Sequence, residues 1–236
     1  MKNKSPSRHT VTAMFDRIAP TYDRLNKVLS FGIDSLWRKS VKKHLPKKEN
    51  LILVDLATGT CDQIISLGST PNIKKFIGID LSEKMLSLGK KKIDQKGLSK
   101  KVQLQLGSAL DIPLSPQSVD CVTMSFGIRN VTDPSKCLKE MYRILNNGGQ
   151  AMILEFSKPT LPVIRGGYLF YLRHILPRIG KILSKDPDAY VYLNKTIEDF
   201  PSGQNFLSLM NDTGFIHTKR VSMTLGVVNL TLGKNE

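Results

Sequence analysis

One stretch, Leu51–Asp62 (LILVDLATGTCD), constrains the fold of this chain more than any other. It begins with a continuous apolar run, passes an acid and then enters a turn of small residues. Such a run, bounded by a glycine-containing turn, is typical of a strand buried on both faces of a parallel sheet. Gly59 has no Cβ, so the backbone of the turn can approach a ligand closely. In open α/β sheets ligands bind beyond the carboxyl ends of the strands, where this turn would lie.

A second strand-like segment, Lys75–Asp80 (KFIGID), also ends in an acid. Asp80 follows Gly59 by 21 residues, the spacing at which a carboxylate accepts hydrogen bonds from ribose hydroxyls in nucleotide-binding folds. The GxGxxG pattern of a dinucleotide site is absent, so we expect a nucleoside ligand without a pyrophosphate. S-adenosylmethionine is such a ligand, and Asp55 and Asp80 would contact its amino-acid and ribose ends. Taken alone, the first turn is equally compatible with a strand, turn and helix that bind nothing.

The rest of the chain continues to alternate strands and helices. Further strands are predicted at Lys101–Leu106, Ser118–Phe126, Gln150–Phe156, Phe215–Ser222 and Thr224–Leu232. Ser82 is expected to cap one helix, and Asp133 with Pro134 to open another that ends at Gly148 and Gly149. This rhythm favours right-handed crossovers and an α/β, Rossmann-like fold. We expect a mostly parallel seven-stranded sheet with one antiparallel strand and helices on both faces.

The length of 236 residues fits a single large α/β domain. We predict a disordered N-terminus over residues 1–10 and one domain over 11–236. Within the domain, residues 11–44 read as helical and rich in aromatics. They either pack on the domain or form a lid whose Tyr22 and Asp23 point into the site. Residues 160–198 contain no strand pattern and are predicted to be an insertion on the substrate side.

Composition narrows the class of protein further. No run of eighteen apolar residues exists, and the N-terminus lacks an apolar core for secretion, which predicts a cytoplasmic protein. Cysteines 61, 121 and 137 form no close pair, and the four histidines have no metal-ligand spacing. We therefore expect a protein without a metal site.

The net charge of +15, from 35 basic and 20 acidic residues, favours an anionic partner. Much of the excess positive charge lies in short lysine clusters at residues 42–43, 47–48, 90–92 and 100–101. These clusters lack interleaved aromatics, so they do not resemble a base-stacking surface for nucleic acid. Within the insertion, the aromatic and apolar stretch Tyr168–Leu176 is mixed with basic residues that include Arg165, Lys181 and Lys185. That stretch is either a cap packed on the sheet or a surface that meets lipid or an apolar substrate. The charge itself is also compatible with a role in solubility alone.

Five motifs match a known family along almost the whole chain, from about Phe15 to Leu230. They are FDRIAPTYDRLN, LSFGIDSLWRK, SFGIRNVTD, LEFSKP and GVVNL. With them the chain resembles the class I S-adenosylmethionine-dependent methyltransferases and, more narrowly, the ubiquinone/menaquinone biosynthesis C-methyltransferase family. The resemblance implies S-adenosylmethionine as cofactor. It also implies methylation of a carbon in a polyprenylated quinol, either demethylmenaquinol or the benzoquinol of the ubiquinone pathway.

The resemblance also implies roles for individual residues. Cofactor contacts fall on Thr60, Asp80, Ser108, Ala109 and Ser125. Of these, Asp80 would bind the ribose hydroxyls, and Ser125 would lie near the sulfonium. Thr58 and Cys61 stand where the family usually has further glycines. We expect their side chains to narrow the cofactor turn.

The chemistry of carbon methylation assigns the remaining roles. A quinol carbon becomes nucleophilic when the neighbouring hydroxyl loses its proton, so the protein must favour a phenolate and align the two reactants. Arg129 fits as a cation beside the oxyanion, unless it forms an ion pair that fixes its loop. Asn130 could hold a ring oxygen. The base is Asp23, Tyr22 or a water molecule.

Other functions remain as alternatives. A methyltransferase with an oxygen or nitrogen acceptor would have the same cofactor residues, and so would an RNA methyltransferase. The absence of an added RNA-binding module disfavours the latter, and the missing glycine pattern disfavours a dehydrogenase. Because a polyprenylated acceptor lies in the bilayer, we expect peripheral association with an anionic surface, the inner face of the cytoplasmic membrane. The sequence leaves open the ring type, the tail length and the oligomeric state, including a homodimer.

Overall fold

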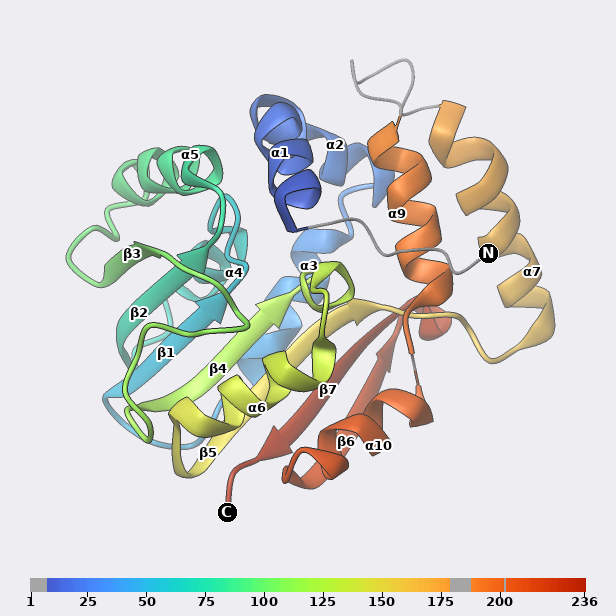
Figure 1. Cartoon of the computed structure of the whole chain (residues 1–236). Helices are drawn as coiled ribbons and strands as arrows, with labels where there is room; N and C mark the ends of the chain where they lie inside the picture. The colour runs from blue at the N-terminus through green and yellow to red at the C-terminus, as the bar shows by residue number, and fades with distance from the viewer. Residues whose placement is uncertain (1–7, 179–187, 202) are drawn as a thin grey trace.

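A seven-stranded mixed sheet forms the centre of the protein in a computed structural model that describes residues 8–178, 188–201 and 203–236 (Figure 1). The strands lie in the order β3-β2-β1-β4-β5-β7-β6. They are β1 Leu51–Leu56, β2 Ile73–Asp80, β3 Val102–Leu106, β4 Val119–Ser125, β5 Leu145–Phe156, β6 Ile216–Met223 and β7 Val228–Lys234. β7 runs antiparallel between β5 and β6, and the other neighbouring pairs are parallel. The predicted fold class, with one antiparallel strand, is confirmed.

β1 lies in the middle of the parallel part, between β2 and β4. Its apolar side chains are buried, except for the partly buried Ile52, because helices cover both faces of a parallel sheet. Asp55 is the exception in this run, and it lies opposite Gly78 of β2 and Thr123 of β4. The strand therefore carries one buried acid towards its carboxyl end.

Helices pack on both faces of the sheet, as the alternating pattern predicted. One face is covered by α3 Asp34–Ser40, α4 Asp62–Leu67 and α5 Glu83–Gln95. The other is covered by α6 Pro134–Ile144 and α10 Gln204–Asp212. The predicted caps are confirmed: Ser82 Oγ accepts from the N–H of Met85 (3.0 Å), and Asp133 accepts from the N–H of Lys136 (2.9 Å).

The end of α6 was predicted too far along the chain. The helix ends at Ile144, not at Gly148 and Gly149. Leu145 already has extended backbone, with φ −73° and ψ 134°, and it pairs with Val119 of β4. Gly148 has φ +74°, so its turn lies inside the irregular start of β5. Strand pairing with β4 thus ends the helix before the glycines are reached.

The last strand also begins later than predicted. Thr224–Gly226 forms a 3₁₀ turn, η5, and β7 starts at Val228. The hydroxyl of Thr224 accepts a hydrogen bond from Nε1 of Trp37 (2.8 Å). This contact joins α3 to the terminal pair of strands.

A group of helices lies beyond the carboxyl ends of the strands (Figure 1). From the N-terminal segment come α1 Arg8–Ile18, η1 Ala19–Thr21 and α2 Tyr22–Leu29; from the predicted insertion come α7 Pro162–Phe170, the π-helical turn η4 Tyr171–Ile175 and α9 Asp188–Asp199. η1 and the left-handed Gly32 (φ +73°) interrupt the helical run of the N-terminal segment. Residues 1–7, Lys181 and Lys185 lie outside the described residues. Across the described residues, none of the helices has the length and apolar character needed to cross a bilayer.

Candidate active site

Three adjoining hollows among the described residues lie beyond the carboxyl ends of β1, β2, β4 and β5, where ligands bind in this kind of sheet. The large cavity has a volume of about 250 Å³, the cleft about 120 Å³ and the small hollow about 20 Å³. Tyr22 lines all three. Phe15, Phe126 and Asn130 line both the large cavity and the cleft. The hollows therefore meet at one junction, formed by α1, α2 and the end of β4.

The cleft brings together most of the residues predicted to hold a cofactor. Its walls include Gly59, Asp80, Ser108, Ala109 and Ser125, from four different strand ends. Asp80 is fixed by two backbone donors: the N–H of Gly59 at 2.8 Å and the N–H of Ser82 at 2.9 Å. Burial raises the pKa of this carboxyl, and the two N–H groups offset part of that rise. The geometry leaves a half-buried carboxylate, held by two backbone N–H groups, on the wall of the cleft.

The small hollow contains a second acid, Asp55, which is fully buried. Asp55 accepts hydrogen bonds from the hydroxyls of Thr58 (2.6 Å) and Thr123 (2.6 Å). Burial raises its pKa to about 6, although both hydroxyls act in the opposite direction. Thr60, also predicted to contact the cofactor, lines the same hollow. A bound cation beside Asp55 would favour its charged form.

The expected narrowing of the turn by Cys61 is not found. Cys61 has a left-handed backbone with φ +67°, and its side chain is fully buried in the core below α5. A Cβ built on Gly89 would approach Cys61 Sγ to 2.4 Å, so the helix accommodates the thiol by having no side chain there. Cys61 lines none of the three hollows. Thr58 does line the small hollow, with its hydroxyl turned to Asp55.

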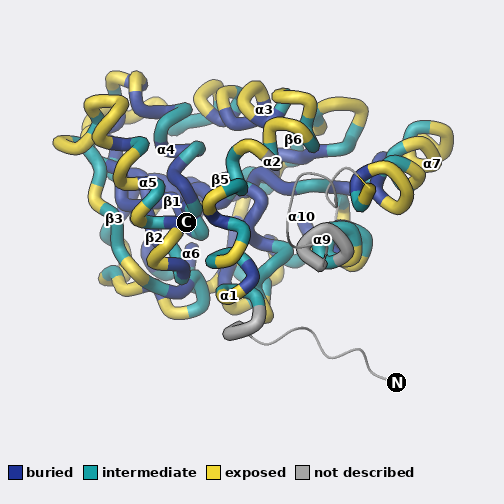
Figure 2. Tube along the Cα trace, turned by 90° about the horizontal axis from the view of Figure 1, so that it is seen from above, coloured by how far each residue is buried: buried dark blue, intermediate teal, exposed yellow. Residues whose placement is uncertain are grey.

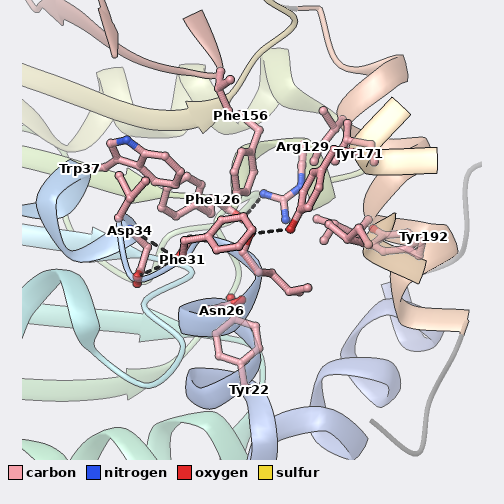
Figure 3. Close-up of a pocket in the computed structure, with 18 of the residues that line it drawn as sticks. Tyr22, Asn26, Phe31, Asp34, Trp37, Phe126, Arg129, Phe156, Tyr171 and Tyr192 are labelled. Carbon is pink, nitrogen blue, oxygen red and sulfur yellow. Dashed lines mark hydrogen bonds between the residues drawn. The ribbon is translucent and has the colours of Figure 1, made fainter. Parts of the chain in front are cut away.

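The large cavity is lined mainly by apolar and aromatic side chains (Figure 3). Its rings come from three distant parts of the chain: Phe15, Tyr22, Phe31 and Trp37, then Phe126 and Phe156, then Tyr168, Tyr171 and Tyr192. The hydroxyl of Tyr171 donates to the carbonyl of Leu29 (2.8 Å), which joins η4 to α2. The N-terminal helices and the insertion therefore close over the same space.

Arg129 lies on the wall of the large cavity, on η3 Ile128–Asn130. Its guanidinium pairs with Glu155 (2.7 Å) and donates to the carbonyl of Phe126 (2.6 Å). It also lies 5.3 Å from the centroid of the Phe156 ring. The side chains of Arg129 and Glu155 are only 8% and 4% exposed. The ion pair that the sequence offered as an alternative is present, and the cation also borders the cavity.

Asp23 is the one predicted site residue that lines none of the three hollows. Its carboxylate accepts from the hydroxyl of Thr60 (2.5 Å) and from Nζ of Lys92 (2.6 Å). Its neighbour Tyr22 does face the junction. The structure thus brings Tyr22, Arg129 and Asn130 together and leaves Asp23 in a separate polar cluster.

Several residues on these walls were not predicted from the sequence. Phe126 directly follows β4, has φ +60° and lines both the cleft and the large cavity. Gln63 is buried and lies on none of these walls, but it accepts a hydrogen bond from the hydroxyl of Ser125 (2.9 Å) and so orients that side chain. Arg38 lines both the large cavity and the small hollow. The motif LSFGIDSLWRK, which contains Arg38, was the available signal.

Comparison with known sequences gives consistent matches. A sequence model of the ubiE/COQ5 methyltransferase family matches residues 2–235. The ubiquinone/menaquinone biosynthesis C-methyltransferase UbiE of Geotalea daltonii is 41% identical over 225 residues, covering 95% of each chain. The demethylmenaquinone methyltransferase of Porphyromonas gingivalis is 36% identical over 229 residues, covering 97% of this chain and 94% of its own.

Solved structures with low sequence identity share the fold. A methyltransferase of Thermotoga maritima, described as a possible histamine N-methyltransferase, has a TM-score of 0.68 at 22% identity, with 96% of this chain and all of that chain covered. Phosphoethanolamine N-methyltransferase 2 of Haemonchus contortus, solved with S-adenosyl-L-methionine, has a TM-score of 0.62 at 16% identity. That match covers 83% of this chain and 51% of the other. At such identities the likeness shows the fold alone.

Proposed function

The chain belongs to the ubiE/COQ5 methyltransferase family, and we propose from this premise that it methylates a ring carbon of a polyprenylated quinol with S-adenosylmethionine. One observation carries the proposal: the large cavity, rich in aromatic residues, and the cleft that contains Asp80 meet at shared walls formed by Phe15, Tyr22, Phe126 and Asn130. A donor in the cleft and a flat ring in the cavity would meet at that junction.

The residues present fit S-adenosylmethionine. Asp80 would accept from the ribose hydroxyls, and Ser108 with Ala109 would flank the adenine. Asp55 and Thr60 would border the amino-acid end, whose ammonium group supplies the cation that a buried carboxylate lacks. Bound there, the cofactor supplies a methyl group on a positively charged sulfur. No phosphate cradle is needed for this ligand, in agreement with the single glycine of the turn.

The large cavity supplies what the acceptor requires. Aromatic side chains on opposite walls would hold the ring at a fixed distance from the cleft and exclude water. Arg129 would stabilise the negative charge on the ring oxygen, because a cation in a water-poor cavity acts more strongly than one in solvent. Asn130, on the wall shared with the cleft, would hold a ring oxygen. The hydroxyl proton would leave through Tyr22 or through a water molecule at the junction.

The reaction can be tested with purified protein. We expect methyl transfer from labelled S-adenosylmethionine to the ring carbon of a short-chain demethylmenaquinol or demethylbenzoquinol kept reduced under anaerobic conditions. Mass fragmentation locates the new methyl group, and comparing the two acceptors identifies the ring. Cells that lack the protein should accumulate a quinone short of one methyl group. Transfer to oxygen or nitrogen instead of carbon, or normal quinones in those cells, would contradict the proposal.

The mouth of the large cavity carries the features of a membrane-binding surface. Three segments that line the cavity expose apolar side chains to solvent: Val163 is 86% exposed, Leu225 is 69% exposed, and Phe31, which itself lines the cavity, is 75% exposed. Figure 2 shows α7, which carries Val163, at the periphery of the molecule. Arg24 and Arg165 are exposed on α2 and α7. Exposed apolar residues beside basic ones suit the interface of an anionic bilayer. We place this mouth at the inner face of the cytoplasmic membrane, where it would receive the acceptor.

The membrane contact should depend on both charge and apolar surface. Vesicles with anionic lipid should co-sediment the protein at low salt, and binding should fall as salt rises, since each nearby basic residue contributes about 1 kcal/mol that salt screens. Val163→Ser should weaken binding. Leu106→Ser is the matched control, because Leu106 is 50% exposed but lies on edge strand β3. Equal binding to neutral and anionic vesicles, or equal loss in both variants, would contradict the assignment.

A further inference from the structure

Lys92 of α5 holds together three elements that surround the cofactor site. Its ammonium group lies 2.6 Å from Asp23 Oδ2 on α2 and 3.1 Å from Thr60 Oγ1 in the cofactor turn. It also bonds Asp62, the first residue of α4. An ammonium group has three N–H donors, and here each finds an acceptor. The contact is partly shielded, with the side chain of Lys92 only 25% exposed.

The two carboxylates of this cluster can lie close together only because Lys92 lies between them. Lys92 brings one positive charge to the two carboxylates of Asp23 and Asp62. Burial by itself would lower the pKa of Lys92, but the carboxylates outweigh it and raise the pKa. Without the ammonium, two negative charges would face each other across the gap between α2 and α4. Removal of Lys92 should therefore push α2 away as well as release it.

Asp23 connects this cluster of charged residues to the junction of the three hollows. Asp23 follows Tyr22, which lines all three hollows, and both lie in the first turn of α2. A second acid of the N-terminal helices, Asp16 on α1, accepts from the hydroxyl of Ser82 (2.5 Å). The N–H of Ser82 donates in turn to Asp80. Each acid thus ties the N-terminal helices to a residue next to the cofactor cleft.

We propose that Lys92 is a positioning residue, which clamps Asp23 against the cofactor turn and thereby holds Tyr22 at the junction of the cleft and the large cavity. The proposal rests on the proposed function only for what Tyr22 does there. It gives Asp23 a structural task in place of the predicted task of a base. It also couples the cofactor site to the N-terminal helices through Thr60.

The test compares Lys92→Met with Lys91→Met, an exposed neighbour on the same helix. In Lys92→Met, amides of residues 11–29 should exchange hydrogen about tenfold faster, while those of β1 and β4 stay unchanged. Affinity for S-adenosylmethionine, measured by calorimetry without any acceptor, should fall several-fold. Lys91→Met should match the wild type in both. Because neither measurement uses the acceptor, a wrong acceptor would not affect the outcome.

Asp23→Asn completes a double-mutant cycle and keeps the shape of the side chain. If Lys92 acts through Asp23, the double variant should shift exchange and affinity no further than the larger single change. Should Lys92→Met fail to fold, Asp23→Asn alone should show faster exchange over residues 11–29. Additive effects would overturn the proposal. So would an Asp23→Asn variant that loses kcat but keeps wild-type exchange, since that pattern would make Asp23 the base.

Discussion

Asp80→Asn should weaken the binding of S-adenosylmethionine by roughly 10- to 100-fold. The carboxylate lies on the wall of the cleft, held by the N–H groups of Gly59 and Ser82. Two ribose hydroxyls would donate to it, and a charged acceptor strengthens each of these hydrogen bonds. Loss of that charge costs about 1.5–3 kcal/mol, and 1.4 kcal/mol corresponds to a factor of ten in affinity. An amide also turns one of the two acceptors into a donor that faces other donors.

Titration calorimetry of the purified protein measures this change directly. Asp94→Asn is the matched control: Asp94 is an exposed acid near the end of α5, and its substitution removes the same charge. Its affinity for the cofactor should equal that of the wild type. An unchanged affinity in Asp80→Asn would show that the carboxylate does not contact the ligand.

The parts of the fold that were predictable are those encoded by local patterns. β1 and β2 are continuous apolar runs, so their burial on two faces follows from the sequence alone. Ser82 and Asp133 cap helices through bonds to residues three positions later, which is also a local pattern. Such features need no knowledge of distant segments.

The end of α6 shows where local patterns fail. Nδ2 of Asn235 donates to the carbonyls of Leu145 (2.8 Å) and Tyr142 (3.3 Å). It thus satisfies two carbonyls where α6 gives way to β5. The partner lies 90 residues away, near the C-terminus. The glycine pair at 148–149 is a good local stop signal, but a distant residue and the pairing with β4 decide the boundary.

The candidate site also contains a part that local patterns predict and a part that they do not. The cofactor residues could be predicted because each follows a parallel strand, and the carboxyl ends of such strands meet at one edge. The partners of charged residues could not. Arg129 and Glu155 are 26 residues apart, and Lys92 reaches an acid 69 residues away. Which acid a cation meets depends on how the helices pack over the sheet, and no periodicity in the sequence records that.

Glu155→Gln should lower the free energy of unfolding by about 3–5 kcal/mol, because it leaves the guanidinium of Arg129 buried without a counter-charge. Oε1 of Glu155 accepts from Arg129 and from the N–H of Phe156 (2.9 Å), and Oε2 accepts from the N–H of Arg129 (3.3 Å). A glutamine keeps one acceptor, and its amide N–H₂ must face another donor. With both side chains less than 10% exposed, water cannot replace the lost charge.

Urea unfolding of the two proteins, compared at equal m-values, measures the loss. Glu198→Gln is the matched control, since Glu198 pairs with Arg173 at 2.6 Å but the side chains are 29% and 54% exposed. Water can solvate the charge that an exposed pair leaves behind, so the urea midpoint of Glu198→Gln should shift much less than that of Glu155→Gln. If the two variants shift the midpoint equally, the buried pair contributes no more than a surface pair. Arg129 would then be held in the cavity wall by its bond to the carbonyl of Phe126 and its contact with the Phe156 ring, not by Glu155.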